Sequence, residues 1–178
     1  MTDPGTYLRG STEPWVVDVL VALVAAHRPH FLLETGTFEA TTTMRLLDAM
    51  STYAHIHGSF LLTLESDPER AEAASALMAI RQVPMMVGCE VRQADALEVL
   101  RSLPPDSVDF CFIDDNHEIP HVAQEIPEVQ RILQPGGIAC FHDVVGPYGL
   151  GTLVRQAGGV ALNFPRLHMA GGLGILTK

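Results

Sequence analysis

Short apolar runs alternate with helix-like segments along most of the chain. The runs contain few polar residues, as is typical of parallel strands that helices cover on both faces. Strands are therefore expected at residues 30–34, 60–64, 89–92, 108–113 and 138–141. Helical spacing, often with a proline in the first turn, predicts helices at residues 14–26, 39–50, 68–80, 96–102 and 120–133. This alternation predicts an α/β fold with a mainly parallel sheet.

The last part of the chain is rich in glycine and breaks this alternation. Two closing strands are expected there, at about residues 159–164 and 172–177. The 178 residues contain no repeat and no linker, and they suffice for one domain with a sizeable core. We therefore expect a single domain, 1–178, with three parts. These are an N-terminal helical segment over 1–29, a cofactor-binding core over 30–145 and closing strands over 146–178.

Charge and composition narrow the kinds of partner. The chain carries 11 basic and 21 acidic residues, and its net charge is −10. Such a surface repels nucleic acid and anionic lipid, because both are bound mainly through lysine and arginine. No apolar run is long enough to cross a membrane, and the first residues do not resemble a secretory signal. We expect a cytoplasmic protein that binds a small molecule, and the alanine-rich, arginine-over-lysine composition suits a high-GC bacterial gene.

The three cysteines support the same location. Cys89, Cys111 and Cys140 lie in strand-like runs and form no CxxC pair. They are therefore expected to be buried free thiols, which persist in a reducing compartment.

An acidic residue stands at the end of each of the five predicted parallel strands or shortly after it. In open α/β sheets, ligands bind beyond the carboxyl ends of the strands, so these side chains are expected at one site. They are Glu34, Glu65, Asp95, Asp114 and Asp143.

The loop after the first strand adds a candidate ligand contact. Gly36 allows a tight turn and a close approach of a ligand to the backbone. The following helix begins near Thr41 and Thr42, where free amides can hold a carboxylate or a phosphate. A single glycine is not the GxGxxG pattern of dinucleotide-binding proteins. Glu65, at the end of the second strand, is placed to accept hydrogen bonds from both hydroxyls of a ribose.

Several stretches together resemble class I S-adenosylmethionine (SAM)-dependent methyltransferases. Within that group the chain is similar to small-molecule O-methyltransferases of the catechol O-methyltransferase and methyltransferase domain 24 types. The stretches are residues 31–36 (FLLETG), 64–65 (LE), 93–96 (QADA), 108–114 (VDFCFID) and 133–143 (LQPGGIACFHD). The resemblance implies a Rossmann-like fold, in which a seven-stranded, mainly parallel sheet has an antiparallel C-terminal strand and helices on both faces. The family often has a second glycine where this chain has Ala40.

The resemblance also implies residues that bind SAM. Glu34, Gly36, Thr37 and Phe38 would surround the methionine part, and Thr42 would lie near its carboxylate. Glu65 would hold the ribose, while Ser66, Asp95 and Ala96 would border the adenine. Asp114 would face the sulfonium.

Two histidines and two acids are the candidates for activating the acceptor. Many relatives hold a divalent metal at the positions of Asp114, His142 and Asp143. Imidazole suits Mn²⁺, Fe²⁺ or Zn²⁺ better than Mg²⁺, and a metal would lower the pKa of the acceptor hydroxyl. His117 stands where relatives place a base, and it can accept a proton near neutral pH. Without a metal, His142 is a competing base that Asp143 would orient.

The leading hypothesis is SAM-dependent methyl transfer to the hydroxyl of a small molecule, either metal-assisted or metal-independent with a histidine base. One alternative is a nicotinamide- or nucleotide-binding domain, against which the missing glycines and the lack of a Tyr-Lys pair argue. Another is a domain that binds the cofactor without catalysis. The other histidines are expected to be incidental. Relatives of the catechol type usually have a longer N-terminal helical segment over the substrate. This chain has one predicted helix there, so its pocket is either open or completed by a second subunit, and we predict a homodimer.

Overall fold

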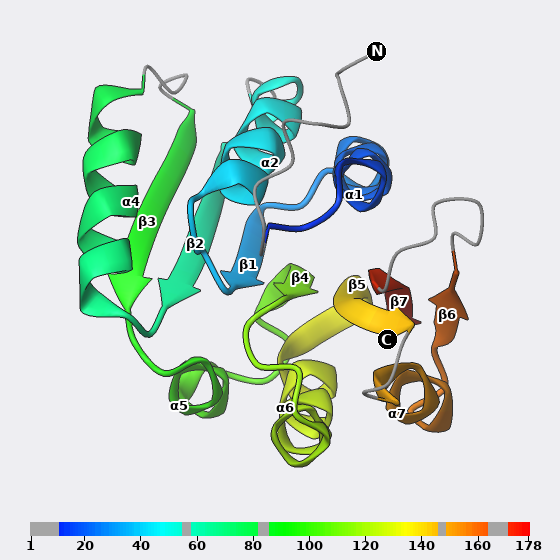
Figure 1. Ribbon diagram of the computed structural model, residues 1–178. Coiled ribbons are helices and arrows are strands. Elements are labelled where there is room, and N and C mark those ends of the chain that lie inside the picture. Colours follow the sequence, from blue (N-terminus) through cyan, green and yellow to red (C-terminus); the bar gives the residue numbers. More distant parts are fainter. Residues whose placement is uncertain (1–10, 55–57, 82–85, 146–148, 164–170) are drawn as a thin grey trace.

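A seven-stranded sheet forms the centre of the molecule, and helices cover both of its faces (Figure 1). The computed structural model describes residues 11–54, 58–81, 86–145, 149–163 and 171–178. The strands are β1 (Phe31–Thr35), β2 (Ser59–Glu65), β3 (Val87–Gln93), β4 (Val108–Ile113), β5 (Leu133–Val145), β6 (Val160–Leu162) and β7 (Gly171–Thr177). The helices are α1 (Pro14–His27), α2 (Thr41–Ser51), α4 (Pro68–Ile80), α5 (Ala96–Ser102), α6 (Ile119–Ile132) and α7 (Leu150–Gln156).

The strand order locates the candidate site. The strands lie in the order β3-β2-β1-β4-β5-β7-β6. Strands β1 to β5 pair in parallel, whereas β7 runs antiparallel to β5 and to β6. The order reverses between β1 and β4, because the chain first builds outward to β3 and then returns to the other side of β1. Ligands of open α/β sheets bind at such a reversal, beyond the carboxyl ends of the strands.

Two apolar layers hold the helices against the sheet. On one face, α1 and α2 pack on the central strands through residues such as Leu20, Leu47 and Phe110. On the other face, α5, α6 and α7 pack against strand residues such as Cys111 and Phe141. Neighbouring strand residues point to opposite faces, so a strand covered on both sides is buried along most of its length. This double burial explains the apolar strand sequences.

The fold class expected from the sequence is confirmed, including the antiparallel C-terminal strand. Three elements, α4, α5 and β4, begin and end at the predicted residues. The two expected closing strands are present as β6 and β7, but the helix α7 that precedes them was not predicted. Its sequence, LGTLVRQ, contains a glycine that disfavours a helix. A Cβ atom on Gly151 would lie 2.5 Å from the Val144 carbonyl oxygen, so this glycine lets α7 pack closely on β5.

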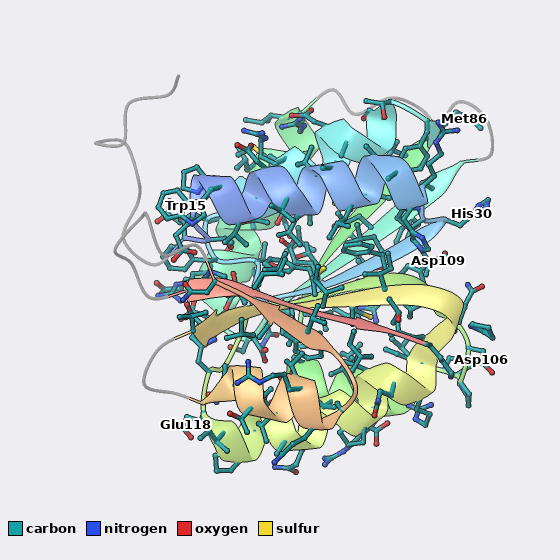
Figure 2. All side chains as sticks on the ribbon, turned by 90° about the vertical axis from the view of Figure 1, so that its right-hand side faces the viewer. Trp15, His30, Met86, Asp106, Asp109 and Glu118 are labelled. Carbon is teal, nitrogen blue, oxygen red and sulfur yellow. The ribbon has the colours of Figure 1, made fainter. Side chains whose placement is uncertain are left out.

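The start of α1 lies at the same edge of the sheet as the strand carboxyl ends. In Figure 2, Trp15 and Glu118, beside the N-terminal ends of α1 and α6, lie at one edge, and His30 and Asp109 lie at the other. His30 directly precedes β1, so the Trp15 edge is the one at which the parallel strands end. The segment before α1 is thereby brought next to the site.

The three cysteines are free thiols. Cys111 and Cys140 are buried free thiols, as predicted, whereas Cys89 is half-buried. Burial raises the pKa of Cys89 to about 11 and raises the pKa values of the other two thiols as well. Thiols with raised pKa values are poor nucleophiles near neutral pH.

Within the described parts of the chain, no helix has the length and apolar character needed to span a membrane.

Candidate active site

A cavity of about 670 Å³ opens at the carboxyl ends of the parallel strands. Its walls come from the loops that follow these strands and from the segment before α1. Apart from Glu34, every site residue expected from the sequence lines it. These residues are Gly36, Thr37, Phe38, Thr42, Glu65, Ser66, Asp95, Ala96, Asp114, His117, His142 and Asp143.

The loop after β1 turns sharply at Gly36, whose φ angle is +81°. A Cβ atom there would lie 2.2 Å from the carbonyl oxygen of Asp114, so only glycine fits. The amides of Gly36 and Thr37 both donate to the carbonyl oxygen of Leu64, which ties the loop to the end of β2. Ala40 has a φ of +56°, a conformation that glycine adopts without strain.

Two acids at the ends of β2 and β3 are fixed by backbone amides. Glu65 accepts hydrogen bonds from the amide of Phe38 at 2.8 Å and from the amide of Asp67 at 3.0 Å. Asp95 caps α5 by accepting a bond of 2.9 Å from the amide of Glu98. Both carboxylates line the cavity, so their positions are set before any ligand arrives.

Glu34 does not line the cavity. Side chains alternate along β1, and that of Glu34 is fully buried on the α2 face, where the Thr43 hydroxyl donates to it at 2.6 Å. Burial raises the pKa of Glu34 to about 7, although hydrogen bonds from Thr43 and Thr63 act in the opposite direction. The expected contact between Glu34 and a bound methionine moiety stays a prediction; in the structure its carboxyl group is held by Thr43 of α2.

His142 lies between two carboxylates. Its Nδ1 is 2.7 Å from Oδ1 of Asp114, and its Nε2 is 2.5 Å from Oε2 of Glu13. Burial by itself lowers the pKa of His142, but the charge of Asp114 and the hydrogen bonds to Asp114 and Glu13 outweigh it and raise the pKa to about 10. At neutral pH the ring is therefore an imidazolium that donates to both carboxylates.

The segment before α1 contributes two site residues that the sequence did not reveal. Thr12 donates to Oδ2 of Asp114 at 2.6 Å and accepts from Thr42 at 3.0 Å. Glu13 is buried against His142. In the sequence, Glu13 stood out only as the residue before the first proline of a helix. Gly171 leaves room for its carboxylate, because a Cβ atom there would lie 2.2 Å from Oε1.

His117 is the more accessible histidine of the site. Its side chain is 31% exposed, compared with 6% for His142. Its Nε2 lies 3.2 Å from Oδ2 of Asp143 and 3.9 Å from Oδ1 of Asp114. Asp143 has a φ of +54°, and the pairing of β5 with β7 shifts register between His142 and Val145. This irregularity lets two consecutive residues, His142 and Asp143, face the cavity together.

The distances at His142 are those of hydrogen bonds rather than those between ligands around one metal ion. Two ligands on one metal, at bonds of about 2.0–2.2 Å, lie about 3 Å or more apart. The two ring nitrogens of His142 are instead 2.5 and 2.7 Å from carboxylate oxygens, which is hydrogen-bond spacing. One ligand atom from each of Asp114, His117 and His142 lies within 4.8 Å of the others, and the same holds for Glu13, His142 and Asp143. The metal set expected from the sequence therefore stays a prediction.

A second group of titratable residues adjoins the cavity on the α6 side. His121 Nε2 lies 3.2 Å from Oδ2 of Asp115 and 3.5 Å from Oε1 of Glu125. Burial, the charge of Asp115, a hydrogen bond with Asp115 and the charge of Asp95 raise the pKa of Glu125 to about 9. His121 and Asp115 line the cavity, so the expectation that the remaining histidines are incidental is wrong for His121. Residues 55–57, which include two more histidines, lie outside the described parts of the chain.

Comparison with a known family decides the class of protein. The sequence model of a methyltransferase-domain family matches residues 33–144. The chain belongs to this methyltransferase family. The matched segment runs from β1 to β5 and so contains the strands whose carboxyl ends form the cavity. No curated protein matches the sequence of the methyltransferase significantly.

Solved structures share the fold of the methyltransferase over nearly its whole length. An O-methyltransferase of Streptomyces achromogenes involved in tomaymycin synthesis, solved with SAM, is 20% identical with a TM-score of 0.70, over 95% of this chain and 82% of that chain. An O-methyltransferase of Bacillus cereus in complex with SAH is 16% identical with a TM-score of 0.72, over 98% and 86%. A SAH-bound methyltransferase of Podospora anserina is 15% identical with a TM-score of 0.71, over 99% and 83%.

The raised pKa of Glu34 predicts how stability depends on pH. The pKa is 4.5 in the unfolded reference and about 7 in the folded chain, so folding becomes less favourable as pH rises from 4.5 to 7. A pKa difference of about 2.5 corresponds to about 3 kcal/mol. Urea unfolding of Glu34→Gln should therefore show a stability, relative to the unmodified chain, that increases by up to about 3 kcal/mol between pH 4.5 and pH 8.

Glu72→Gln, which changes an exposed glutamate of α4, is the matched control for losing a carboxylate. A stability difference between Glu34→Gln and the unmodified chain that stays constant across this pH range would contradict the assignment.

Proposed function

We propose that this methyltransferase transfers the methyl group of SAM to a hydroxyl of a small-molecule acceptor, without a metal. The observation that carries the proposal is the cavity at the strand reversal, where amide-fixed acids, an acid-bound imidazolium and a second histidine face one space. The family match and the SAM- or SAH-bound structures of the same fold support the cofactor. The O-methyltransferases among those structures support a hydroxyl acceptor.

The acidic wall suits a cationic cofactor. The carboxylates on it belong to Glu13, Glu39, Glu65, Asp95, Asp114, Asp115 and Asp143. Arg70 is the only lysine or arginine among the described lining residues, and its guanidinium lies over the ring of Phe38, 4.8 Å from the centroid. SAM carries a sulfonium and an ammonium against one carboxylate. The carboxylates attract the sulfonium electrostatically and form no covalent bond with it. Its methyl group therefore remains available for transfer.

The positions of the cofactor parts follow from the walls of the cavity. The loop at Gly36 and Phe38 offers backbone close to the methionine part, and Thr37 and Thr42 border it. The Glu65 carboxylate accepts hydrogen bonds from two backbone amides. It is placed to accept hydrogen bonds from the ribose hydroxyls, either in addition to these amides or in their place. Asp95 borders the adenine. Ser66 and Ala96 also line the cavity, and we assign them to the adenine side together with Asp95.

His117 is the base in this proposal. Its imidazole is partly exposed in the cavity, and the carboxylate of Asp143, 3.2 Å from Nε2, stabilises the imidazolium that forms when His117 takes the acceptor proton. The acceptor oxygen then bonds to the methyl carbon while the carbon–sulfur bond breaks. The electron pair of that bond returns to sulfur and gives S-adenosylhomocysteine, so the positive charge passes to His117.

His142 is not the base in this proposal. A ring that is already protonated at neutral pH and donates to Asp114 and Glu13 has no basic nitrogen to offer. Its positive charge instead holds Asp114 at the place where the sulfonium would lie. The methyl transfer therefore relies on positioning by His142 and proton removal by His117.

The cofactor is tested by calorimetric titration of the chain with SAM, S-adenosylhomocysteine and NAD, each with Mg²⁺ and with a chelator. We expect micromolar binding of the first two ligands, equal in both conditions, and no binding of NAD.

Glu65→Gln should weaken SAM binding by about tenfold or more, because a charged hydrogen-bond acceptor is lost. Glu90→Gln, on the exposed part of β3, should not. Binding of NAD but not SAM would overturn the proposal, and SAM binding that needs Mg²⁺ would overturn its metal-free form.

The base is tested by His117→Gln in single-turnover methyl transfer to a panel of phenols. Loss of a positioned general base should slow transfer by about 10²- to 10⁴-fold. SAM affinity should change little, because His117 acts on the acceptor. His30→Gln is the matched control, since His30 lies at the opposite edge of the sheet (Figure 2). Transfer by His117→Gln at the rate of the unmodified chain would assign the proton to another group.

A further inference from the structure

Beside the cavity, Asp115, His121 and Glu125 form a separate group, called here the α6 cluster. Asp115 follows β4, while His121 and Glu125 lie on α6. Positions i and i+4 of a helix share one face, so the two helical side chains point the same way. The proposed methyl transfer uses none of the three.

The spacing within the α6 cluster is that of ligands around one metal ion. Zinc bonds of about 2.0–2.1 Å in a tetrahedron place the ligand atoms about 3.3 Å apart. His121 Nε2 lies 3.2 Å from Asp115 and 3.5 Å from Glu125, and one ligand atom from each residue lies within 4.8 Å of the others. The contact between His121 and Asp115 is also of hydrogen-bond length, but here one ring nitrogen faces two carboxyl groups, whereas at His142 each nitrogen faces its own.

Glu125 points to a missing cation independently of these distances. Its side chain is 0% exposed, and no hydrogen bond of ordinary geometry reaches either carboxyl oxygen within the described residues, although Asp115 lies close enough to raise its pKa. Buried polar groups without hydrogen bonds are costly, and a cation between the three side chains would satisfy them.

The surroundings of Asp115 are those of a supported metal ligand. The hydroxyl of Thr35 donates to Oδ1 of Asp115 at 3.1 Å, which leaves Oδ2 turned toward His121. Hydrogen bonds of this kind orient the carboxylates that bind metals. Asp115 and His121 line the cavity whereas Glu125 lies behind them, so a metal here would keep one position on the cavity side.

We propose that Asp115, His121 and Glu125 bind a divalent transition metal, preferentially Zn²⁺, with a fourth position open to the cavity. One imidazole and two carboxylates are typical zinc ligands, and Mg²⁺ would favour oxygen atoms alone. This site is distinct from the positions after β4 and β5 at which Asp114, His142 and Asp143 were considered.

The site is tested by titrating the chelator-treated, full-length chain with Zn²⁺ in a calorimeter. We expect one tight Zn²⁺ per chain. His121→Gln and Glu125→Gln should each weaken that binding by about 100-fold or more, because each removes a direct ligand. Co²⁺ in place of Zn²⁺ should give the intense visible absorption of a tetrahedral complex, and both variants should lose it.

Two controls separate this site from others. Glu128→Gln changes another acid of α6, bonded to Arg131, and Asp143→Asn changes the group at His142. Both should keep the affinity of the unmodified chain, and thermal unfolding checks that every variant folds. The proposal is overturned if the unmodified chain binds no Zn²⁺, if His121→Gln binds it equally well, if only Asp143→Asn loses it, or if Co²⁺ gives only weak absorption.

Discussion

The imidazolium of His142 joins parts of the chain that are far apart in sequence. It binds Asp114 at the end of β4 and Glu13 before α1, and the charge of Asp143 lies next to it. Without a cation, three carboxylates so close together would repel one another or take up protons. The position of the N-terminal segment and the shape of one end of the cavity therefore both depend on this one charged ring.

The same contact divides the chemical roles within the cavity. The ring of His142 is held on both nitrogens, whereas His117, which lies near Asp143 and Asp114 and is partly exposed to the cavity, is the residue to which the proposal gives the role of base. The built-in positive charge of His142 is the basis of the metal-free form of the proposed reaction. In the proposed reaction, SAM binds beside Glu65 and Asp95, whose carboxylates are already fixed by backbone amides. The acceptor gives its proton to His117.

The sequence predicted the sheet well because strands covered on both faces must be apolar, a constraint that each strand carries locally. It also predicted most of the cavity, since parallel strands end at one edge. The helix α7 was missed because Gly151 serves packing against Val144 rather than helix propensity. Glu13 and Glu125 were missed because an acid before a helix or on one is ordinarily solvated, and only tertiary contacts bury these two.

The protonation state of His142 tests the central claim most directly. Nitrogen NMR of the ¹⁵N-labelled, metal-free chain distinguishes protonated from unprotonated ring nitrogens, and His142→Gln assigns the signal. At pH 8, between the ordinary pKa of 6.5 and the raised value of about 10, the account predicts protons on both nitrogens of His142. A ring with one unprotonated nitrogen at that pH would contradict it.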